Sequence, residues 1–490
     1  MTRFALAFAA LLSLVPLCAA AQPAAAPATA PAAKPPGYYG LAEKYREPAG
    51  ALLGAALTDE EGWDKLVYLT TAIGHRLSGS PQLEEAIAWA AGRMKEENLA
   101  VTLQPVKVPH WVRGQESAEV VAPIRRQIAI LGLGGSVGTP KEGIEAPVLV
   151  VESFEELEAL DPAQVKGKIV AYCVPWMGYG KTVAYRGAGA SRAAKMGAAA
   201  VLVRSATGHS LSTPHTGAMR YAEGVEKIPA AAMTPETSEW LKQMEKLGKE
   251  VTVRLKMEAQ TLPDADSANV IAEIRGSEKP EEVVVMGGHY DSWDVGHGAH
   301  DDGAPCMAAW QALRLVQKLG LKPRRTLRVV LWTNEENGVR GGEGYRAALS
   351  EAELKNHVAA IEMDGGMERP NKFGLSIKDL DPAKDPLYAE AFGRLVEISS
   401  LFAGIEADRI DTDGGGVDIG PLMREGVPGL SLETVGEHYF DWHHSEADTL
   451  DKVDKQDFRR AVGMLAVMGY VLADMPDRLV PPAEKSAAAP

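Results

Sequence analysis

Short apolar runs alternate with amphipathic stretches through most of this chain of 490 residues. Three runs stand out, VVVMGG at 283–288, TLRVVLW at 326–332 and VAAIEM at 358–363. All are far shorter than the roughly 20 residues that a membrane helix needs, and they predict strands buried on both faces of a parallel sheet. The stretch APCMAAWQALRLVQKLG at 304–320 has helical periodicity and ends at a glycine. Strand, helix and strand in this order predict the right-handed crossover of an α/β fold.

Carboxylate and imidazole side chains follow each of these three strands. They are His289, Asp301, Asp302, Glu335, Glu336 and Asp364. Because open α/β sheets bind ligands at the carboxyl ends of their strands, we expect these side chains to share one site. One imidazole and one or two carboxylates per ion suit catalytic zinc, and a carboxylate can bridge two ions about 3.5–4 Å apart. The set therefore predicts a pair of zinc ions.

Each cluster also has an ordinary structural interpretation. An isolated His-x-Asp is usually a turn, and a Glu pair after a strand is usually a solvated cap. Asp302, followed by Gly303 and Pro305, can simply begin a helix. Glu362 stands two residues before Asp364 and would share its face on a strand, so the choice between them stays open. The occurrence of all the clusters in order, each at a strand end, favours the metal site.

A further motif, HHSEADT at 443–449, supplies another imidazole. The succession HYD, HDDG, NEEN, EMDGG and HHSEADT resembles the co-catalytic di-zinc exopeptidases, a family that includes bacterial aminopeptidases. The flanks DSWDVG, LGGSVGT and DIGPL resemble its carboxypeptidase Q branch. The resemblance covers nearly all of residues 38–475 and is strongest at 264–450. It implies an α/β zinc exopeptidase fold, in which helices flank a mixed, mostly parallel central sheet, with an inserted protease-associated domain.

The resemblance also implies a role for each motif residue. Two zinc ions per chain would be bridged by Asp301, and Glu335 would act as the general base. The other ligands that it implies are His289, Glu336, Asp364 and His444. The family pattern places the ligand His directly before Ser or Thr, which selects His444 over His443. The peptide bond between Asp301 and Asp302 is expected to be cis, as in the family.

Four further residues in or near the motifs are candidates for orienting a ligand or contacting substrate: Asp291, Asp302, His443 and Asp418. Asp291 stands two residues after His289 and is expected to orient its ring. Asp418 follows a glycine-rich stretch, and a structural turn is an equally good interpretation. The resemblance gives no role to His297 and His300, which precede the Asp301-Asp302 pair.

The chain divides into six predicted segments. They are a signal peptide (1–21), an Ala/Pro-rich linker (22–37), the first part of a peptidase domain (38–137), a protease-associated insert (138–256), the catalytic part of the peptidase domain (257–478) and a disordered tail (479–490). In the insert, Tyr179, Lys181, Tyr185 and Arg186 are predicted to lie in a long loop that is either solvated or close to the active site. The insert returns the chain directly before the His289 strand, which predicts that its loops cover the metals.

The amino-acid composition limits the classes of partner and the cellular compartments that suit this chain. The chain carries 66 acidic and 51 basic residues, a net charge of −15, which argues against nucleic acid or an anionic membrane surface as partner. Outside the signal peptide only Cys173 and Cys306 occur, too few for a disulfide scaffold, and both are predicted to be buried. We expect a secreted or periplasmic protein without a membrane span. Lipid attachment at Cys18 stays open, and the resemblance suggests a homodimer.

These expectations describe a secreted di-zinc metallo-exopeptidase that hydrolyses dipeptides or short peptides. Water activated by the metals would attack the peptide with a Glu as general base. The resemblance favours a carboxypeptidase Q-like enzyme. The alternatives are an aminopeptidase with the same zinc ligands, a glutaminyl cyclase-like enzyme and a non-catalytic receptor-like relative. The motifs do not separate amino-terminal from carboxyl-terminal cleavage, because the same metal residues serve both.

Overall fold

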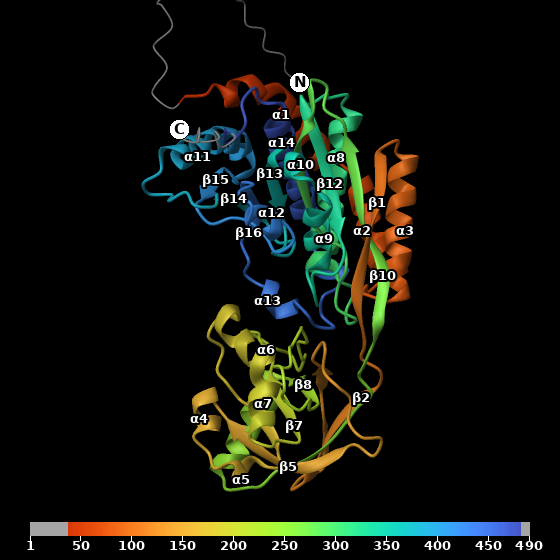
Figure 1. The fold of residues 1–490 in the computed structure, drawn as a ribbon, viewed down its shortest axis with the longest axis vertical. Coiled ribbons are helices and arrows are strands. Elements are labelled where there is room, and N and C mark those ends of the chain that lie inside the picture. The colour runs from red at the N-terminus through yellow and green to blue at the C-terminus, as the bar shows by residue number, and fades with distance from the viewer. Residues whose placement is uncertain (1–37, 482–490) are drawn as a thin grey trace, which may run out of the picture. The chain divides into compact units, whose positions relative to one another are not determined.

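The computed structural model describes residues 38–481, which form two eight-stranded sheets with helices on their faces (Figure 1). The predicted signal peptide and linker lie outside the described residues, as does most of the predicted tail. One sheet is built from segments near both ends of the described range, and the other from the middle of the chain. The second sheet therefore interrupts the first in sequence.

The first sheet is mixed, with four parallel and three antiparallel neighbour pairs. Its strand order is β1-β10-β12-β11-β13-β16-β14-β15. The strands are β1 (Ala100–Val112), β10 (Gln260–Ile274), β11 (Lys279–His289), β12 (Arg325–Trp332), β13 (His357–Glu362), β14 (Pro370–Ser376), β15 (Arg409–Asp411) and β16 (Gly429–Thr434). The run β12-β11-β13-β16 is parallel throughout, which confirms the mostly parallel central sheet predicted from the apolar runs.

Alternate residues of β11 face two different apolar cores, as expected of a strand buried on both sides. Val284 and Met286 pack into the larger core, whereas Val283 and Val285 pack into a smaller one. Helices of the larger core are α1 (Leu41–Leu57), α2 (Glu61–Tyr68), α3 (Pro81–Glu96), α8 (Ala304–Lys318), α11 (Pro386–Ser399) and α14 (Lys455–Asp474). The smaller core lies against α9 (Arg340–Ala348), α10 (Glu351–Lys355) and α12 (Gly420–Met423). The sheet is thus covered on both faces.

Two helices show how far local sequence determines these elements. The start of α3 follows from its local sequence, because Ser80 Oγ accepts a hydrogen bond from the Leu83 N–H at 3.2 Å and Pro81 occupies the first turn. The helix α8, predicted to be amphipathic, is instead buried around most of its circumference. Contacts with the neighbouring helices α2 and α14, in addition to those with β11 and β12, explain the difference. Cys306 lies in α8 and is buried, as predicted.

The second sheet has the order β3-β2-β9-β5-β6-β7-β8-β4, in which β5 to β8 are parallel. Its strands are β2 (Glu116–Ala122), β3 (Arg126–Ile128), β4 (Ile130–Gly132), β5 (Ile144–Val151), β6 (Ile169–Tyr172), β7 (Ala200–Arg204), β8 (Ala230–Met233) and β9 (Thr252–Met257). Its helices are α4 (Phe154–Glu158), α5 (Pro162–Val165), α6 (Tyr179–Lys195) and α7 (Pro235–Lys246). A separate apolar core covers each of the two faces of this sheet, so the sheet has hydrophobic packing of its own.

The prediction of a long loop around Tyr179 is wrong, because this stretch forms the helix α6. The stretch contains Gly180, Gly187 and Gly189 and has no clear apolar periodicity, so its local sequence does not indicate that a helix begins at Tyr179. Tyr185, Ala190 and Ala193 pack into a core of the second sheet, and this tertiary packing stabilises a helix that local propensity does not favour. The four residues assigned to the loop therefore lie on a helix.

The second sheet also begins earlier than the predicted insert. Its first strand, β2, starts at Glu116 and pairs with β9, whereas the preceding β1 pairs with β10 in the first sheet. The chain therefore crosses between the sheets just before Glu116 and again just after Met257. We propose that the insert spans residues 116–257 rather than 138–256.

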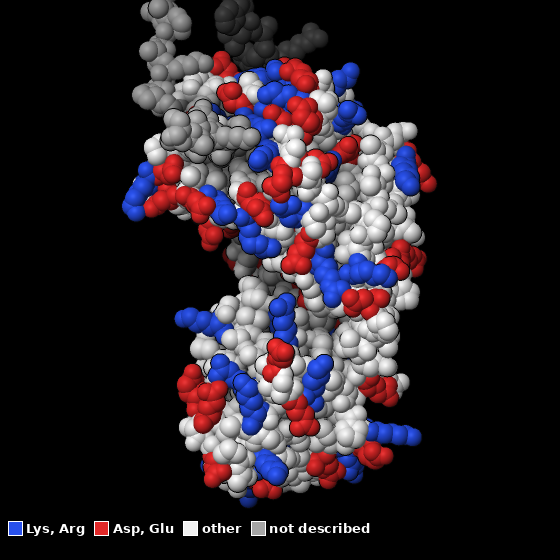
Figure 2. Space-filling view, viewed as in Figure 1, with Lys and Arg blue, Asp and Glu red and all other residues white. Residues whose placement is uncertain are grey.

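Two further observations concern the charges on the surface and the apolarity of the helices. Lys and Arg side chains are interspersed with Asp and Glu over the face shown in Figure 2. Within residues 38–481, no helix combines the length and the apolarity needed to cross a membrane.

A glycine of β11 offers a test of the central packing. Gly287→Ala is expected to lower the thermal unfolding midpoint, because the added Cβ would collide with the carbonyl oxygen of Val330 on β12. Overpacking of this kind costs about 1–3 kcal/mol. Gly50→Ala in α1 is the control, since a Cβ there meets nothing within 4 Å and Ala is favoured in helices by about 0.5–1 kcal/mol. Thermal melts followed by circular dichroism should give a lower midpoint than wild type for Gly287→Ala, and an equal or higher one for Gly50→Ala. Equal midpoints for Gly287→Ala and wild type would contradict this packing.

Candidate metal centre

The residues predicted to bind metal lie together at the carboxyl ends of neighbouring parallel strands. His289 ends β11, Glu335 and Glu336 follow β12, and Asp364 follows β13. In the sheet β11 lies between β12 and β13, so the three ends are adjacent. His444 follows the short helix α13 (Tyr439–Trp442) and joins them. The shared edge predicted from the strand order is therefore present.

The turn after β12 is fixed by Asp291. Asn334 adopts a φ of 64°, a left-handed conformation that Asn tolerates better than most residues. The Asp291 carboxylate then accepts hydrogen bonds from the backbone N–H groups of Glu335 at 2.9 Å and Glu336 at 3.3 Å. The expected contact with the His289 ring is made mainly by the backbone carbonyl of Asp291, 3.0 Å from Nδ1, while its carboxylate lies 3.7 Å away. Asp291 thus stabilises both the Glu pair and the imidazole.

Asp448, in the HHSEADT motif, stabilises the turn that carries Asp301. Its carboxylate accepts hydrogen bonds from the backbone N–H groups of residues 299–301 at 2.7–3.2 Å. The peptide bond between Asp301 and Asp302 is cis, as the family resemblance implied. Asp302 Oδ2 accepts a hydrogen bond from the backbone N–H of His289 at 3.0 Å, which ties the turn to β11.

A buried arginine that sequence reasoning passed over stabilises the loop before this turn. The Arg76 side chain is fully buried and donates hydrogen bonds to the carbonyl oxygens of Tyr290, His297 and Gly298 at 2.9–3.0 Å. These contacts connect residues more than 200 positions apart in the chain. The local sequence GHRLSGS at 74–80 does not indicate these hydrogen bonds, because the acceptors are backbone atoms of a distant loop.

Two of the three candidate groups of ligand atoms in the described chain share Asp301, and the third joins His289, Asp302 and Asp364. His289 Nε2 lies 3.1 Å from Asp301 Oδ1 and 3.5 Å from Asp364 Oδ1. His444 Nε2 lies 3.2 Å from Asp301 Oδ2 and 3.0 Å from Glu336 Oε2. The two oxygens of one carboxylate therefore face two different imidazoles. This arrangement is the one expected of a carboxylate that bridges two ions.

The hydrogen bonds of the imidazoles distinguish His444 from His443. In His289, Nδ1 lies 3.0 Å from the carbonyl of Asp291, and in His444, Nδ1 lies 3.4 Å from the carbonyl of Thr216. An Nδ1–H donated to a carbonyl leaves the Nε2 lone pair available for metal. The His443 ring instead stacks on that of His444, with 3.5 Å between centroids, and its Nε2 lies 3.8 Å from Asp301 Oδ2. The geometry favours His444, although His443 also belongs to one of the groups.

The partners of the two carboxylates favour Asp364 over Glu362 as the ligand, a choice that the sequence left open. The Glu362 carboxylate accepts hydrogen bonds from the backbone N–H groups of Val417 at 2.9 Å and Ile419 at 2.8 Å. It therefore stabilises the glycine-rich loop before α12. Asp364 is the residue that faces His289. Asp418, in the same loop, is buried, and within the described chain neither of its carboxylate oxygens has a hydrogen-bond partner.

The burial and negative charge of these carboxylates favour the binding of cations. Burial raises the pKa of Glu335 well above its usual range, and the charges of Asp364 and Glu336 add to the rise. Burial, with the charge of Asp301, raises the pKa of Glu336 to about 7. Asp301 Oδ2 and Asp302 Oδ1 are buried without a hydrogen-bond donor in the described chain. Buried carboxylate oxygens without donors are costly unless a cation pairs with them.

The donor set also agrees with zinc. Two imidazole nitrogens lie among carboxylate oxygens, whereas calcium and magnesium prefer oxygen ligands alone. His300 does not take part, because its Nδ1 accepts a hydrogen bond from the Met367 N–H at 3.0 Å in a buried position. His297 is exposed and contacts Arg76 through its carbonyl oxygen. The site therefore fits zinc bound by the five predicted ligands.

Residues of the second sheet contact the HHSEADT motif. The Thr216 N–H donates to the carbonyl of His444 at 2.9 Å, and His215 Nδ1 lies 2.7 Å from the carbonyl of His443. Arg186 Nη1 donates to the carbonyl of Thr216 at 3.3 Å, beside the ring of His444, and its Nη2 donates to the hydroxyl of Tyr179 at 2.9 Å. Sequence reasoning named Tyr179 and Arg186 as possible neighbours of the site, but it missed His215 and Thr216, whose loop carries no recognisable motif.

Tyr185 and Lys181, the other two residues assigned to the predicted loop, do not lie at the metal site. Tyr185 is buried and stacks on Phe154 with 4.2 Å between ring centroids. Lys181 is exposed on α6. These positions follow from the helix, which turns Tyr179 and Arg186 toward α13 and Tyr185 toward the core.

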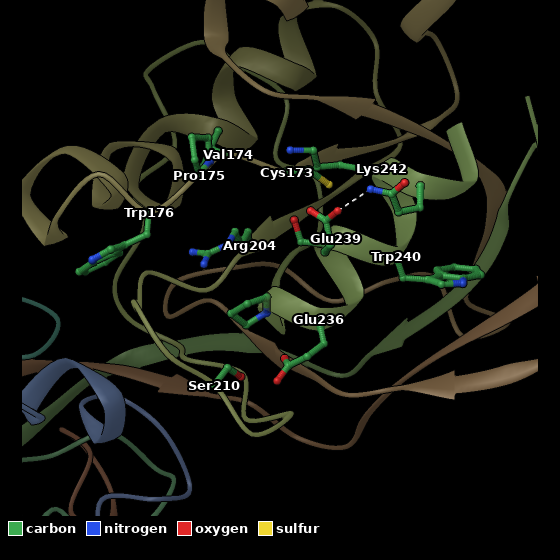
Figure 3. A pocket seen from close by; sticks show the side chains of 13 residues that line it. Cys173, Val174, Pro175, Trp176, Arg204, Ser210, Glu236, Glu239, Trp240 and Lys242 are labelled. Atoms are coloured by element: carbon green, nitrogen blue, oxygen red, sulfur yellow. Dashed lines mark hydrogen bonds between the residues drawn. The ribbon is translucent and has the colours of Figure 1, made fainter. Parts of the chain in front are cut away.

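Two of the cavities in the described residues differ in their relation to the candidate ligands. One of about 510 Å³ includes Asp364 in its wall, beside the candidate ligands. The other, of about 780 Å³, lies at the carboxyl ends of β6 and β7, where Arg204 projects between Trp176 and Trp240 (Figure 3). None of the candidate metal groups among the described residues includes a residue of this second cavity. Of these two cavities, the one beside Asp364 is the one that borders a candidate metal ligand.

This combination of fold and site is that of a zinc metallopeptidase. The chain belongs to peptidase family M28, whose family model matches residues 269–468. It is 43% identical over 418 residues to carboxypeptidase Q of Homo sapiens, covering 85% of this chain and 86% of that protein. A peptidase M28 precursor from Shewanella amazonensis has the same fold, with a TM-score of 0.84 and 32% identity over 91% of this chain and 100% of that chain. The resemblance seen in the motifs is thereby confirmed.

A zinc aminopeptidase from Bacillus subtilis has a similar fold at lower identity. The TM-score is 0.64 at 19% identity, covering 86% of this chain and 96% of that chain. At this level of identity the comparison supports the fold alone. Together with the Shewanella structure, it confirms the α/β zinc peptidase fold class predicted from the sequence.

Proposed function

We propose that this protein is a di-zinc exopeptidase that hydrolyses dipeptides or very short peptides with a free carboxyl terminus. The position of Asp301 carries this proposal, because its two oxygens face the imidazoles of His289 and His444 separately. His289 and Asp364 would bind one ion, and Glu336 and His444 the other. Asp301 would bridge the two.

Zinc bound here would supply Lewis acidity toward a peptide carbonyl and lower the pKa of water to about 7. The chain itself contributes the proton transfers. Glu335, on the turn fixed by Asp291, would accept the proton of the attacking water and return it to the leaving amine. A receptor-like relative without activity is disfavoured, because the base and all five predicted ligands are present.

Arg186 supports recognition of a free carboxylate. Its guanidinium lies beside His444, and its Nε is buried without a hydrogen-bond partner in the described chain. Guanidinium groups bind carboxylates through paired, charge-assisted hydrogen bonds. A substrate carboxylate would satisfy this nitrogen at a position next to the metal ligands. The similarity to carboxypeptidase Q supports the same polarity.

Contacts from the second sheet support a preference for short substrates. Thr216 and His215 are hydrogen-bonded to the backbone of His444 and His443, so their loop lies directly against the ligand motif. A loop in this position would limit the length of chain that reaches the metals. A free terminus buried there without a partner would be costly, whereas a paired one would be selected.

An aminopeptidase is the second candidate. The cavity beside Asp364 also contains Asp413 and Glu433, and such acidic walls suit a free ammonium group. The fold shared with a zinc aminopeptidase is compatible with this assignment. Export directed by residues 1–21, the tail and a homodimeric assembly stay predictions from the sequence.

The test compares free, C-amidated and N-acetylated dipeptides with a decapeptide and denatured casein. We expect cleavage of the free dipeptides, a large loss on amidation and little cleavage of casein. Arg186→Gln should lower kcat/KM for free dipeptides by about tenfold or more, the usual effect of losing a hydrogen bond to a charged group, and change the amidated substrates little. Lys181→Gln, at an exposed position of the same helix, is the matched control.

Two outcomes would contradict the proposal in different ways. Tolerance of amidation together with rejection of acetylation would identify an aminopeptidase. Comparable cleavage of casein and dipeptides would show that the loop around Thr216 does not restrict substrate length.

A further inference from the structure

The cavity beside Asp364 has an acidic wall that the chemistry of the reaction does not require. It is lined by the glycine-rich segment 413–417, by the end of β16 and by Tyr439 and Phe440. Its charged lining residues are Asp364, Asp413 and Glu433, so all the charges in this wall are negative. With Asp364 engaged as a metal ligand, Asp413 and Glu433 are left to face whatever enters the cavity.

Glu433 is fixed in position by its neighbours in the sheet. Ser431, two residues earlier on the same face of β16, donates a hydrogen bond from Oγ to Glu433 Oε1 at 3.0 Å. Lys372 of β14 lies opposite Glu433 in the sheet, with its Nζ 2.8 Å from Glu433 Oε2. Lys372 also pairs with Asp411 of β15. One ammonium group shared by two carboxylates leaves a negative charge in excess at this edge.

The carboxylate of Glu433 is also accessible. Its side chain is 33% exposed, whereas that of Lys372 is 19% exposed. The pair is thus neither sealed in the core nor freely solvated. A cationic group entering the cavity can approach the exposed part of the carboxylate, while Lys372 stays paired with it from the neighbouring strand β14.

The shape of the cavity suits a long side chain. Three consecutive glycines, Gly414 to Gly416, form part of its wall and leave it without side chains there. At Gly416 an added Cβ would collide with the carboxylate of Glu362, so this wall cannot accept a larger residue without rearrangement. The ring of Phe440 forms another part of the wall. Lysine and arginine bury their aliphatic stems on such apolar surface while the charged end meets an acid.

The cavity can be assigned to one side of the scissile bond, given the proposed function on which this inference rests. Arg186, the proposed partner of the terminal carboxylate, contacts His444, whereas the cavity contains Asp364 of the other ligand group. Between them, Tyr179 receives the hydrogen bond of Arg186 and stacks on Phe440 at 4.7 Å. A dipeptide with its carboxylate at Arg186 therefore directs its amino-side residue toward the cavity.

We propose that this cavity binds the side chain of the residue on the amino side of the scissile bond. We further propose that Glu433 makes it select basic side chains over neutral ones, and neutral over acidic ones. The residue acts on specificity and not on the chemical step. Its substitution should therefore change the ranking of substrates and leave the turnover of neutral ones nearly unchanged.

The experiment measures kcat/KM of the zinc-loaded enzyme for lysyl-leucine, methionyl-leucine and glutamyl-leucine. These substrates have the same α-amine and carboxylate, so that only the side chain differs. We expect wild type to prefer the lysyl over the methionyl substrate by about threefold to fivefold, the upper range for a partly exposed ion pair. Glu433→Gln should abolish this preference, and Glu433→Lys should reverse the order of the lysyl and glutamyl substrates.

Asp411→Asn is the matched control, because it also removes an acidic partner of Lys372 but lies outside the cavity wall. It should keep the wild-type ranking. Equal kcat/KM values for the three substrates in wild type, or an unchanged ranking in Glu433→Lys, would overturn the assignment of the cavity while leaving the proposed function intact. Failure of the wild type to hydrolyse any of the three would instead overturn the proposed function and the assignment with it.

Discussion

Replacement of Glu335 by Gln is expected to lower kcat by about 10²–10⁴-fold while the zinc content of the protein stays unchanged. The amide occupies the same space as the carboxylate but cannot accept a proton. Glu335 belongs to none of the candidate ligand groups among the described residues, so its loss should not release metal. Its backbone N–H would still donate to Asp291, which preserves the turn.

The measurement combines zinc analysis by atomic absorption with steady-state kinetics on a free dipeptide. Glu343→Gln is the matched control, because it makes the same chemical change at an exposed position on α9. It should behave as wild type in both assays. Near-normal turnover in Glu335→Gln would eliminate its role as the base, and loss of zinc would place it among the ligands.

The strand-end clusters could be predicted because their signal is local. A buried parallel strand is a short apolar run, and the residue that follows it lies at the edge of the sheet whatever the rest of the chain does. His289, Glu335 and Asp364 are of this kind, and the structure brings them together as expected. The capping of α3 by Ser80 is equally local.

Contacts that join distant segments could not be predicted in this way. Thr216 donates to the carbonyl of His444, and Arg76 to carbonyls of the 290–298 loop, across more than 200 residues. The residues involved belong to no motif, and their partners are backbone atoms. The start that we propose for the insert could not be read from the sequence for the same reason, since β2 resembles any other strand until its pairing with β9 is known.

Where two side chains were candidates for one role, the choice between them also depended on the structure. On sequence grounds Glu362 and Asp364 were both acceptable, because residues two apart on a strand share a face. The decision depends on two backbone N–H groups, of Val417 and Ile419, that bind the Glu362 carboxylate. For Asp291 the predicted contact with His289 is present, but the hydrogen bonds of its carboxylate to the Glu335 turn could not be read from spacing.

The two adjacent histidines of the last motif are expected to respond differently to truncation. His444→Ala should lower zinc content and activity together, because it removes an imidazole whose Nε2 lies within 3.2 Å of both Asp301 and Glu336. Loss of a residue that merely orients a metal ligand typically lowers metal affinity by about 10–100-fold, and loss of a ligand itself should exceed this. His443→Ala should leave zinc content nearly unchanged, since its Nε2 lies 3.8 Å from the nearest of these carboxylates.

The His443 variant also serves as the control for the backbone. Both residues have carbonyls bound by the second sheet, through His215 and Thr216, and an alanine at either position keeps that carbonyl. A difference between the variants therefore reports on the imidazoles alone. His443→Ala removes a ring that stacks on His444, so a moderate loss of activity with zinc retained agrees with the assignment. Zinc analysis after dialysis against a weak chelator decides the matter: if zinc is lost from His443→Ala and kept by His444→Ala, the last ligand is His443.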